Sequence, residues 1–101
     1  MKRIVLFCAG GMSTGLLVNN MRKAAANLDE EYSIDAYGLS EVDNYGPEAD
    51  VILVGPQVRY AVDNIKAKFP NKPIESIDVR TYGMMKGDVV LATARKLLGE
   101  E

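Results

Sequence analysis

The chain has 101 residues and a formal net charge of −2, which predicts a single domain and argues against attraction to nucleic acid. Apolar residues make up 48% and charged residues 26% of the chain, as in soluble globular proteins. No apolar run approaches the ~18 residues of a membrane span, and the first is too short for a signal-peptide core, so we expect a cytoplasmic protein. With no histidine and one cysteine, Cys8, the sequence excludes a cysteine–histidine pair, a histidine metal ligand and an internal disulfide.

Apolar runs alternate with helical patterns along the first half of the chain. Residues 2–7 predict a buried strand, and the alternating residues 32–37 predict a strand nearer the edge of a sheet. Between them, residues 13–28 predict a helix for which Ser13 or Thr14 is a plausible N-cap. The expected apolar stripe of this helix consists of Leu16, Leu17, Met21, Ala24, Ala25 and Leu28.

The middle of the chain carries the strongest strand signal. Residues 40–43 predict a short helical turn, and the β-branched run 50–54 predicts a buried strand. Pro56 suits the first turn of a following helix, and Pro70 ends that helix. The apolar stripe of the helix consists of Val58, Val62, Ile65 and Phe69.

The last part of the chain completes an alternating pattern of strands and helices. Residues 73–78 predict a fourth strand, Asp88 an N-cap for the final helix, and Gly99 its end. The inward residues of that helix are Val90, Leu91, Ala94, Leu97 and Leu98. This alternation predicts an α/β fold in which residues 1–101 form one domain, an open four-stranded parallel sheet of order 2-1-3-4 with helices on both faces.

The segment around Cys8 is the main candidate for chemistry. Cys8 ends the first predicted strand, where open α/β sheets bind ligands, and a glycine-rich turn leads from it into a helix. A glycine loop and a helix N-terminus direct backbone N–H groups at an anion, and Ser13 and Thr14 add hydroxyl donors. The simpler alternative is a tight strand-to-helix turn around a buried cysteine. We expect Cys8 to be the nucleophile of a phosphate-binding loop made of Ala9, Gly10, Gly11, Met12, Ser13, Thr14, Gly15 and Leu16.

The residues of this loop separate several kinds of phosphate chemistry. Gly10 and Gly15 have the spacing of a nucleoside-triphosphate loop, but Leu16-Leu17 stands where that loop needs Lys-Ser or Lys-Thr. Cysteine phosphatases place an arginine six residues after the cysteine, and here that position is Thr14. Without the arginine, which would neutralise transition-state charge, the loop should accept a phosphoryl group but hydrolyse esters poorly. We therefore expect a phosphoryl carrier.

Three longer motifs resemble one protein family. They are Ile-x-Leu-Phe-Cys-x-x-Gly-Met-Ser-Thr at 4–14, Ala-Asp-Val-Ile-Leu-Val-Gly-Pro-Gln at 49–57 and Asn-Lys-Pro-Ile-Glu-x-Ile-Asp at 71–78, with Tyr82-Gly83 and Gly87 continuing the pattern. Over nearly its whole length the chain resembles the enzyme IIB components of the bacterial phosphoenolpyruvate-dependent sugar phosphotransferase system, lactose/cellobiose/chitobiose branch (PTS EIIB type-3). One departure is Gly10-Gly11, where the family pattern has one non-glycine residue.

The resemblance implies a function, partners and a fold. It implies that Cys8 accepts a phosphoryl group from a phosphohistidine of the IIA protein and that a disaccharide of the cellobiose, chitobiose or lactose type then receives it. The membrane IIC permease moves that sugar, so the resemblance implies a cytoplasmic phosphotransferase that associates peripherally with IIC. The family fold is the four-stranded parallel sheet predicted above, which also resembles that of low-molecular-weight cysteine phosphatases. A monomer is the simplest state of such a chain.

Residues after the third and fourth strands are candidates for partner docking. Gln57, Arg59 and Tyr60 follow the third strand, and Arg80 and Tyr82 follow the fourth, so all five should lie at the same edge of the sheet as Cys8. They are candidates for docking IIA or IIC, with ordinary solvated helix starts as the alternative. The pair Met84-Met85 could likewise form an adaptable docking surface or belong to the core.

Two other functions fit parts of this pattern. A low-molecular-weight cysteine phosphatase, or a related arsenate-type reductase, fits the topology and the position of the cysteine. The absent loop arginine, the lack of histidine and the lack of a second cysteine argue against it. A regulatory IIB-like module, in which phosphorylation is a signal, fits the same residues as a transport protein. The sequence does not indicate which sugar is used.

Overall fold

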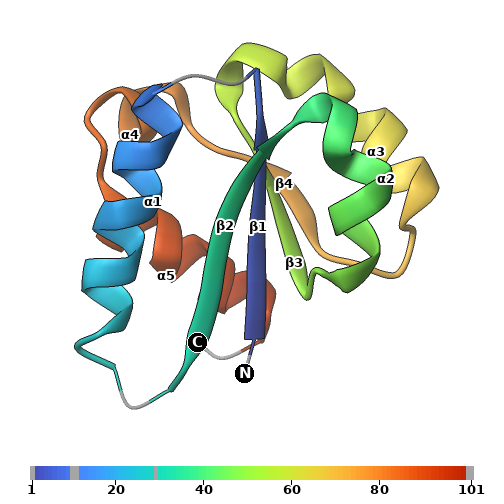
Figure 1. Cartoon of the computed structure of the whole chain (residues 1–101). Helices are drawn as coiled ribbons and strands as arrows, with labels where there is room; N and C mark the ends of the chain where they lie inside the picture. The colour runs from blue at the N-terminus through green and yellow to red at the C-terminus, as the bar shows by residue number, and fades with distance from the viewer. Residues whose placement is uncertain (1, 10–11, 29, 100–101) are drawn as a thin grey trace.

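A computed structural model describes the chain over residues 2–9, 12–28 and 30–99. Its centre is a parallel sheet with the order β2-β1-β3-β4, which confirms the predicted topology (Figure 1). The strands are β1 (Lys2–Cys8), β2 (Tyr32–Gly38), β3 (Val51–Val54) and β4 (Ile74–Ser76). Because all four strands are parallel, their carboxyl ends meet at one edge of the sheet, which is the upper edge in Figure 1.

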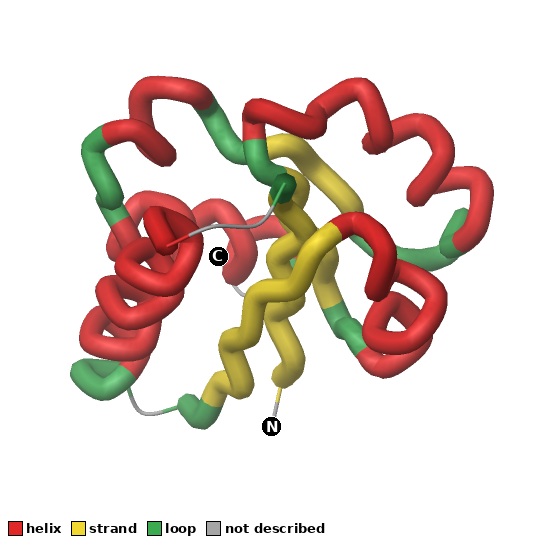
Figure 2. The backbone as a smooth tube through the Cα atoms, turned by 45° about the horizontal axis from the view of Figure 1, so that its top comes forward, coloured by secondary structure: helices red, strands yellow, loops and turns green. Residues whose placement is uncertain are grey.

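Helices cover both faces of the sheet, as predicted (Figures 1 and 2). One face carries α1, α4 and α5, and the other carries α2 and α3 with the neighbouring 3-10 segments. The α-helices are α1 (Met12–Ala25), α2 (Val42–Tyr45), α3 (Val62–Lys68), α4 (Val79–Gly83) and α5 (Gly87–Leu97). The 3-10 segments are η1 (Leu39–Glu41), η2 (Gly46–Glu48) and η3 (Pro56–Ala61). Among the described residues, no helix is both long and apolar enough to span a membrane.

Alternate residues of β1 supply the two halves of the core. Ile4, Leu6 and Cys8 belong to the cluster under α1 and α5, whereas Val5 and Phe7 belong to the cluster under α2 and α3. Successive side chains of a strand point to opposite faces, so a central strand covered on both faces must be apolar throughout. Each fully buried side chain of this kind stabilises the fold by about 1.5–3 kcal/mol.

The first helix differs from its prediction in two details. It begins at Met12, so Ser13 and Thr14 lie in its first turn and are not the N-cap. Leu16, predicted to be in the core, is 52% exposed, whereas Val18 is 4% exposed and takes its place. Neighbouring residues of a helix point about 100° apart, so the stripe that packs against the sheet and α5 includes Leu17 and Val18 and leaves Leu16 outside.

The second half of the chain also departs from the predicted elements. The single helix predicted after Pro56 is two segments, η3 and α3, and the backbone of η3 itself kinks at Val58 (φ −123°). Asp88 is not an N-cap: α5 begins at Gly87, and Asp88 lies in its first turn. A carboxylate there still interacts favourably with the helix dipole. Gly99 follows the helix with φ +81°, which confirms the predicted stop.

Helix α4 was absent from the sequence prediction. It has only five residues, and Asp78 caps it by accepting hydrogen bonds from the Thr81 N–H at 3.0 Å and the Thr81 hydroxyl at 3.3 Å. A capping aspartate followed three residues later by a threonine is the one local signal that could have indicated this helix. The helix is important because it forms one wall of the groove described below.

Asp78→Ala is expected to lower the free energy of unfolding at neutral pH, because α4 loses its side-chain cap. The hydrogen bond from the Thr81 N–H is the main cause that lowers the pKa of Asp78 below its ordinary 3.8. A carboxyl group whose pKa is lowered by folding stabilises the fold above its unfolded pKa and loses that effect as pH falls through the folded pKa. In urea titrations, the deficit of the variant should therefore be largest near neutral pH and shrink below about pH 3.8. A deficit that grows on acidification would contradict this assignment.

Candidate functional site

Cys8 is the last residue of β1 and lies at the carboxyl edge of the sheet. The residue is 1% exposed, and its cluster includes Leu6, Leu17 and Tyr82. It therefore faces α1, which is the helix that follows it in the chain. The predicted position of the cysteine at the carboxyl end of the first strand is confirmed.

The segment that follows Cys8 is only partly described. Ala9 is exposed, and Gly15 and Leu16 are exposed on α1. Gly10 and Gly11 lie outside the described residues, and Met12, Ser13 and Thr14 are described only as the helical start of α1. The positive end of the α1 dipole thus comes shortly after the thiol in the chain, an arrangement that suits an anion. The assignment of this segment as a phosphate-binding loop stays a prediction.

A groove lies between η3 and α4 at the same edge of the sheet. It has a volume of about 630 Å³. Its lining residues are Pro56, Gln57, Arg59, Tyr60, Val79, Tyr82 and Gly83. Four of the five predicted docking residues therefore line one groove, and Arg80, which is exposed, is not among the lining residues. Tyr82 is 5% exposed and is part of the core rather than a solvated helix start.

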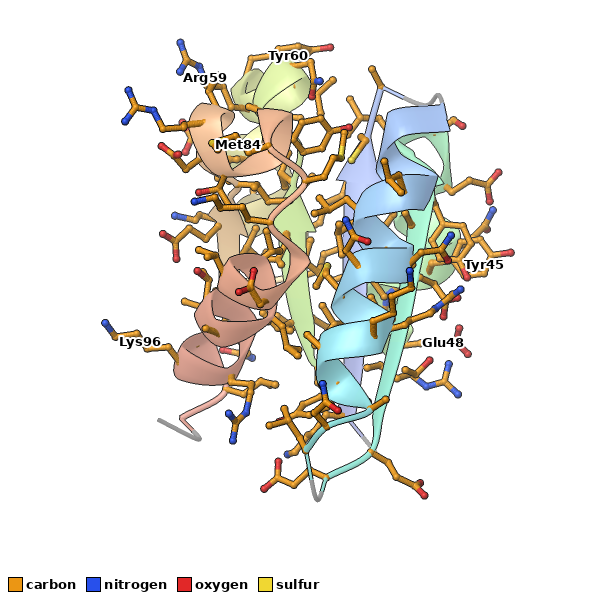
Figure 3. All side chains as sticks on the ribbon, turned by 90° about the vertical axis from the view of Figure 1, so that its left-hand side faces the viewer. Tyr45, Glu48, Arg59, Tyr60, Met84 and Lys96 are labelled. Carbon is orange, nitrogen blue, oxygen red and sulfur yellow. The ribbon has the colours of Figure 1, made fainter. Side chains whose placement is uncertain are left out.

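Exposed apolar side chains surround this groove. Tyr60 is 75% exposed, Val79 is 61% exposed and Met84 is 60% exposed. Figure 3 shows Arg59, Tyr60 and Met84 together at one end of the molecule, with Lys96 toward the other end. Met85 packs partly against the core, so the two methionines have different environments. The sequence did not indicate Val79, because an isolated valine at the start of an unrecognised helix carries no signal of exposure.

A second hollow near Cys8 or a metal site would be another candidate in the described part of the chain. A hollow of about 300 Å³ lies beside β4 between α4 and α5, and Cys8 is not among its lining residues. No group of three or more His, Cys, Asp or Glu side chains among residues 2–9, 12–28 and 30–99 could hold a metal ion. Cys8 does not line the groove beside η3 either, but that groove contains four of the five predicted docking residues.

An open parallel sheet with a thiol at the carboxyl end of its first strand defines an α/β protein that carries a cysteine at the edge where such sheets bind ligands. The family model described as "PTS system, Lactose/Cellobiose specific IIB subunit" matches residues 3–93. The chain is 43% identical over 104 residues to the cellobiose-specific EIIB component of Lactococcus lactis subsp. lactis (strain IL1403), with 96% of each chain covered. It is 35% identical over 100 residues to the oligo-beta-mannoside-specific EIIB component of Bacillus subtilis (strain 168), with 97% of each covered.

Solved structures agree with this relationship. The solution structure of the cellobiose-specific phosphotransferase IIB component from Borrelia burgdorferi superimposes with a TM-score of 0.81 at 30% identity, covering 97% of this chain and 92% of that one. The lactose-specific IIB domain from Streptococcus pneumoniae has a TM-score of 0.80 at 18% identity, covering 94% and 95%, and shows the shared fold alone. The chain belongs to the lactose/cellobiose-specific IIB subunits of the sugar phosphotransferase system. It is a phosphotransferase component of sugar uptake, which confirms the family and the function expected from the motifs.

Proposed function

We propose that Cys8 accepts a phosphoryl group from a phosphohistidine of a IIA protein and passes it to a sugar that enters through a IIC permease. The observation that carries the proposal is the position of Cys8, at the carboxyl end of β1 and shortly before α1, in a chain of the IIB family. Residues 9–16 supply the phosphate-binding loop, in which backbone N–H groups and the hydroxyls of Ser13 and Thr14 hold the phosphoryl oxygens.

The reaction consists of two substitutions at phosphorus. In the first, the Cys8 thiolate forms an Sγ–P bond as the N–P bond of the phosphohistidine breaks, and the imidazole leaves with the electron pair. In the second, a sugar hydroxyl forms an O–P bond as the Sγ–P bond breaks, the hydroxyl loses its proton, and the thiolate is restored. The phosphoprotein donor is already activated, so neither step calls for a nucleotide or a metal ion.

The identity of residue 14 supports a carrier over a phosphatase. An arginine at this position would hold the phosphoryl group bidentately and stabilise the charge that develops during attack by water. Thr14 lacks that charge. The phosphocysteine should consequently persist until a sugar hydroxyl reaches it.

The names of related proteins support the proposed partners. One relative, the lactose-specific EIICB component of Lactococcus lactis subsp. lactis, is 35% identical over 65 residues, which are 64% of this chain and 11% of that protein. Its name joins a IIC and a IIB designation, which supports a IIC partner here. Relatives are named for cellobiose, galactose and oligo-beta-mannosides, and we propose a disaccharide of the cellobiose, chitobiose or lactose type as the acceptor. In this proposal the protein is cytoplasmic and is a monomer when no partner is bound. It associates with the membrane only by binding IIC.

Phosphoryl transfer from a purified, phosphorylated IIA protein tests this proposal. Mass spectrometry of the intact protein and of its peptides should locate one phosphoryl group on Cys8. Addition of membranes that contain the matching IIC should then release it only when the correct sugar is present. Release without sugar would favour a phosphatase, and retention with every sugar tested would favour a regulatory module.

The groove beside η3 is the proposed docking surface for IIA. Gln57, Arg59, Tyr60 and Tyr82 line the groove, and Arg80 adds a second exposed cation on α4. Exposed aromatic and apolar side chains beside arginines have the composition of protein interfaces. A partner bound there lies at the same edge of the sheet as Cys8.

Tyr60→Ser is expected to weaken productive binding of phosphorylated IIA by about tenfold or more. The variant loses the aromatic ring, which is the most exposed of the apolar side chains around the groove. Val79→Ser should have a smaller effect in the same direction. Val89→Ser is the matched control, since Val89 is also exposed, at 42%, but lies on α5 away from the groove. The KM for phospho-IIA in the transfer assay measures the effect. Equal KM values for Tyr60→Ser, Val79→Ser and Val89→Ser would contradict the assignment of the surface.

A further inference from the structure

The end of β3 lies directly against the thiol of Cys8. Gly55, the residue after β3, is buried, and its N–H donates to the Phe7 carbonyl at 2.8 Å. Its own carbonyl accepts from the Val58 N–H at 3.0 Å. A Cβ atom at residue 55 would lie 2.9 Å from Cys8 Sγ and 3.4 Å from Cys8 Cβ, and the first distance is shorter than real Cβ contacts. The sulfur therefore occupies space that only a glycine at this position leaves open.

The backbone of Gly55 does not itself require glycine. Its dihedral angles, φ −60° and ψ 147°, are those of extended chain that any residue adopts. The reason for a glycine is thus the close approach of the Cys8 side chain. Because Gly55 is held by hydrogen bonds on both sides, a larger residue there would displace the sulfur rather than the strand.

The side chain of Gln57 reaches the same place. The point where a Gly55 Cβ would lie is 3.2 Å from Gln57 Oε1. Cys8 Sγ and Gln57 Oε1 consequently lie within 3.2 Å of one point, the position of a Cβ on residue 55. A glutamine amide offers two N–H donors and one acceptor and carries no charge.

We propose that Gly55 and Gln57 position the reacting sulfur and its phosphoryl group: Gly55 leaves the space that Sγ occupies, and the Gln57 amide donates to a phosphoryl oxygen. This inference rests on the proposed function and gives Gln57 a role beside docking. A neutral donor suits a carrier, since it orients the phosphoryl group without the positive charge by which an arginine stabilises attack by water. Gln57 neither gains nor loses a proton while the Sγ–P bond forms and the N–P bond breaks.

Gly55→Ala and Gly38→Ala form a matched pair for testing the role of Gly55. Gly38 is the β2 partner of Cys8 in the sheet, its backbone is also extended (φ −75°, ψ 163°), and a Cβ there meets nothing closer than Ser40 Oγ at 4.0 Å. Gly55→Ala should slow phosphoryl transfer to Cys8 by about 10- to 100-fold through displacement of the sulfur. Gly38→Ala should transfer at the wild-type rate. Equal rates for the two variants would overturn the role of Gly55.

Substitutions of Gln57 test the donor without risk to the fold, since the residue is exposed. Gln57→Leu should slow transfer and leave the titration of the thiol unchanged, because it removes the donor without adding charge. Gln57→Glu should slow transfer and also move the thiol titration to higher pH, because a carboxylate beside Sγ opposes the thiolate. Asn64→Asp is the control for net charge, because it adds the same negative charge at an exposed position on α3.

The Cβ chemical shift of Cys8, followed against pH in selectively labelled protein, reports the thiol directly and needs no partner. Unchanged transfer in Gln57→Leu, or an unchanged titration in Gln57→Glu, would overturn the role of Gln57. If Gly55→Ala fails to fold, the Gln57 variants still decide the proposal for the amide. For the glycine, the double variant Gly55→Ala/Cys8→Ala, which removes Sγ, should then recover the fold, and its failure to do so would overturn the role of Gly55. If the wild-type protein never accepts phosphate but Gln57→Glu still moves the thiol titration to higher pH, the proposed function is refuted. The contact between Gln57 and Cys8 would nevertheless be supported.

Discussion

Cys8→Ser is expected to lower the rate of phosphoryl acceptance from phospho-IIA by about 10³-fold or more, since an unactivated hydroxyl is a far weaker nucleophile than a thiol. The chain has no other cysteine and no histidine that could take over. The measurement is the amount of phosphorylated protein formed with time, resolved by intact mass spectrometry. Binding of IIA to the variant should remain detectable, because the proposed docking surface is unchanged.

The stability of this variant needs a separate measurement. Cys8 is 1% exposed, and a serine hydroxyl in such a place costs about 1–3 kcal/mol when it lacks a partner. Urea unfolding of Cys8→Ser and Cys8→Ala establishes that both variants are folded under the assay conditions. Wild-type transfer by a folded Cys8→Ser protein would refute the proposed nucleophile.

Gly87→Ala is expected to produce the largest loss of stability among the glycine substitutions discussed here. Gly87 is the first residue of α5, and a Cβ there would meet the backbone of α1 at Asn20 and Met21, and the Asn20 side chain at 2.7 Å. Asn20 Nδ2 also donates to the Met85 carbonyl at 2.9 Å and ties α1 to the segment before α5. Backbone atoms of a packed helix cannot move aside cheaply, so α1 and α5 must separate.

Overpacking of this kind should lower the free energy of unfolding by about 3 kcal/mol and the melting temperature by roughly 10–20 °C. Gly83→Ala is the matched control, because Gly83 is also helical and a Cβ there meets nothing within 4 Å. Its stability should equal or slightly exceed that of the wild type, since alanine favours helix. Thermal and urea unfolding compare the two variants, and equal stability for both would contradict the close packing of α5 on α1.

The sequence predicts the sheet well because each strand carries its own signal. The apolar runs that end at Phe7 and Val54 are buried on both faces, and such runs are typical of central parallel strands. The helical details are harder to predict. Helix α4 has five residues, too few for an apolar period to show, and the side on which Leu16 lies depends on where α5 packs.

The chemistry of the site is predicted where it is local and missed where it is not. Cys8, the turn after it and Thr14 lie close together in the sequence, so their residue types indicate phosphate handling without a structure. The contact between Gly55 and Cys8 Sγ joins two strands, and no local pattern shows that the glycine faces the sulfur. The groove likewise unites η3 and α4, and the exposure of Val79 follows only from their packing.

The alternation of β1 between the two halves of the core has a consequence for how the gene can change. The side of the sheet on which the sulfur lies depends on whether the number of residues between the strand's start and Cys8 is odd or even. Insertion or deletion of one codon within β1 would turn the thiol toward α2 and α3, away from α1, the helix into which the predicted phosphate-binding loop leads. A two-codon change would keep the sulfur on its side. The number of residues in β1 is therefore constrained more tightly than the identity of its individual apolar residues, which can be replaced by others of similar volume.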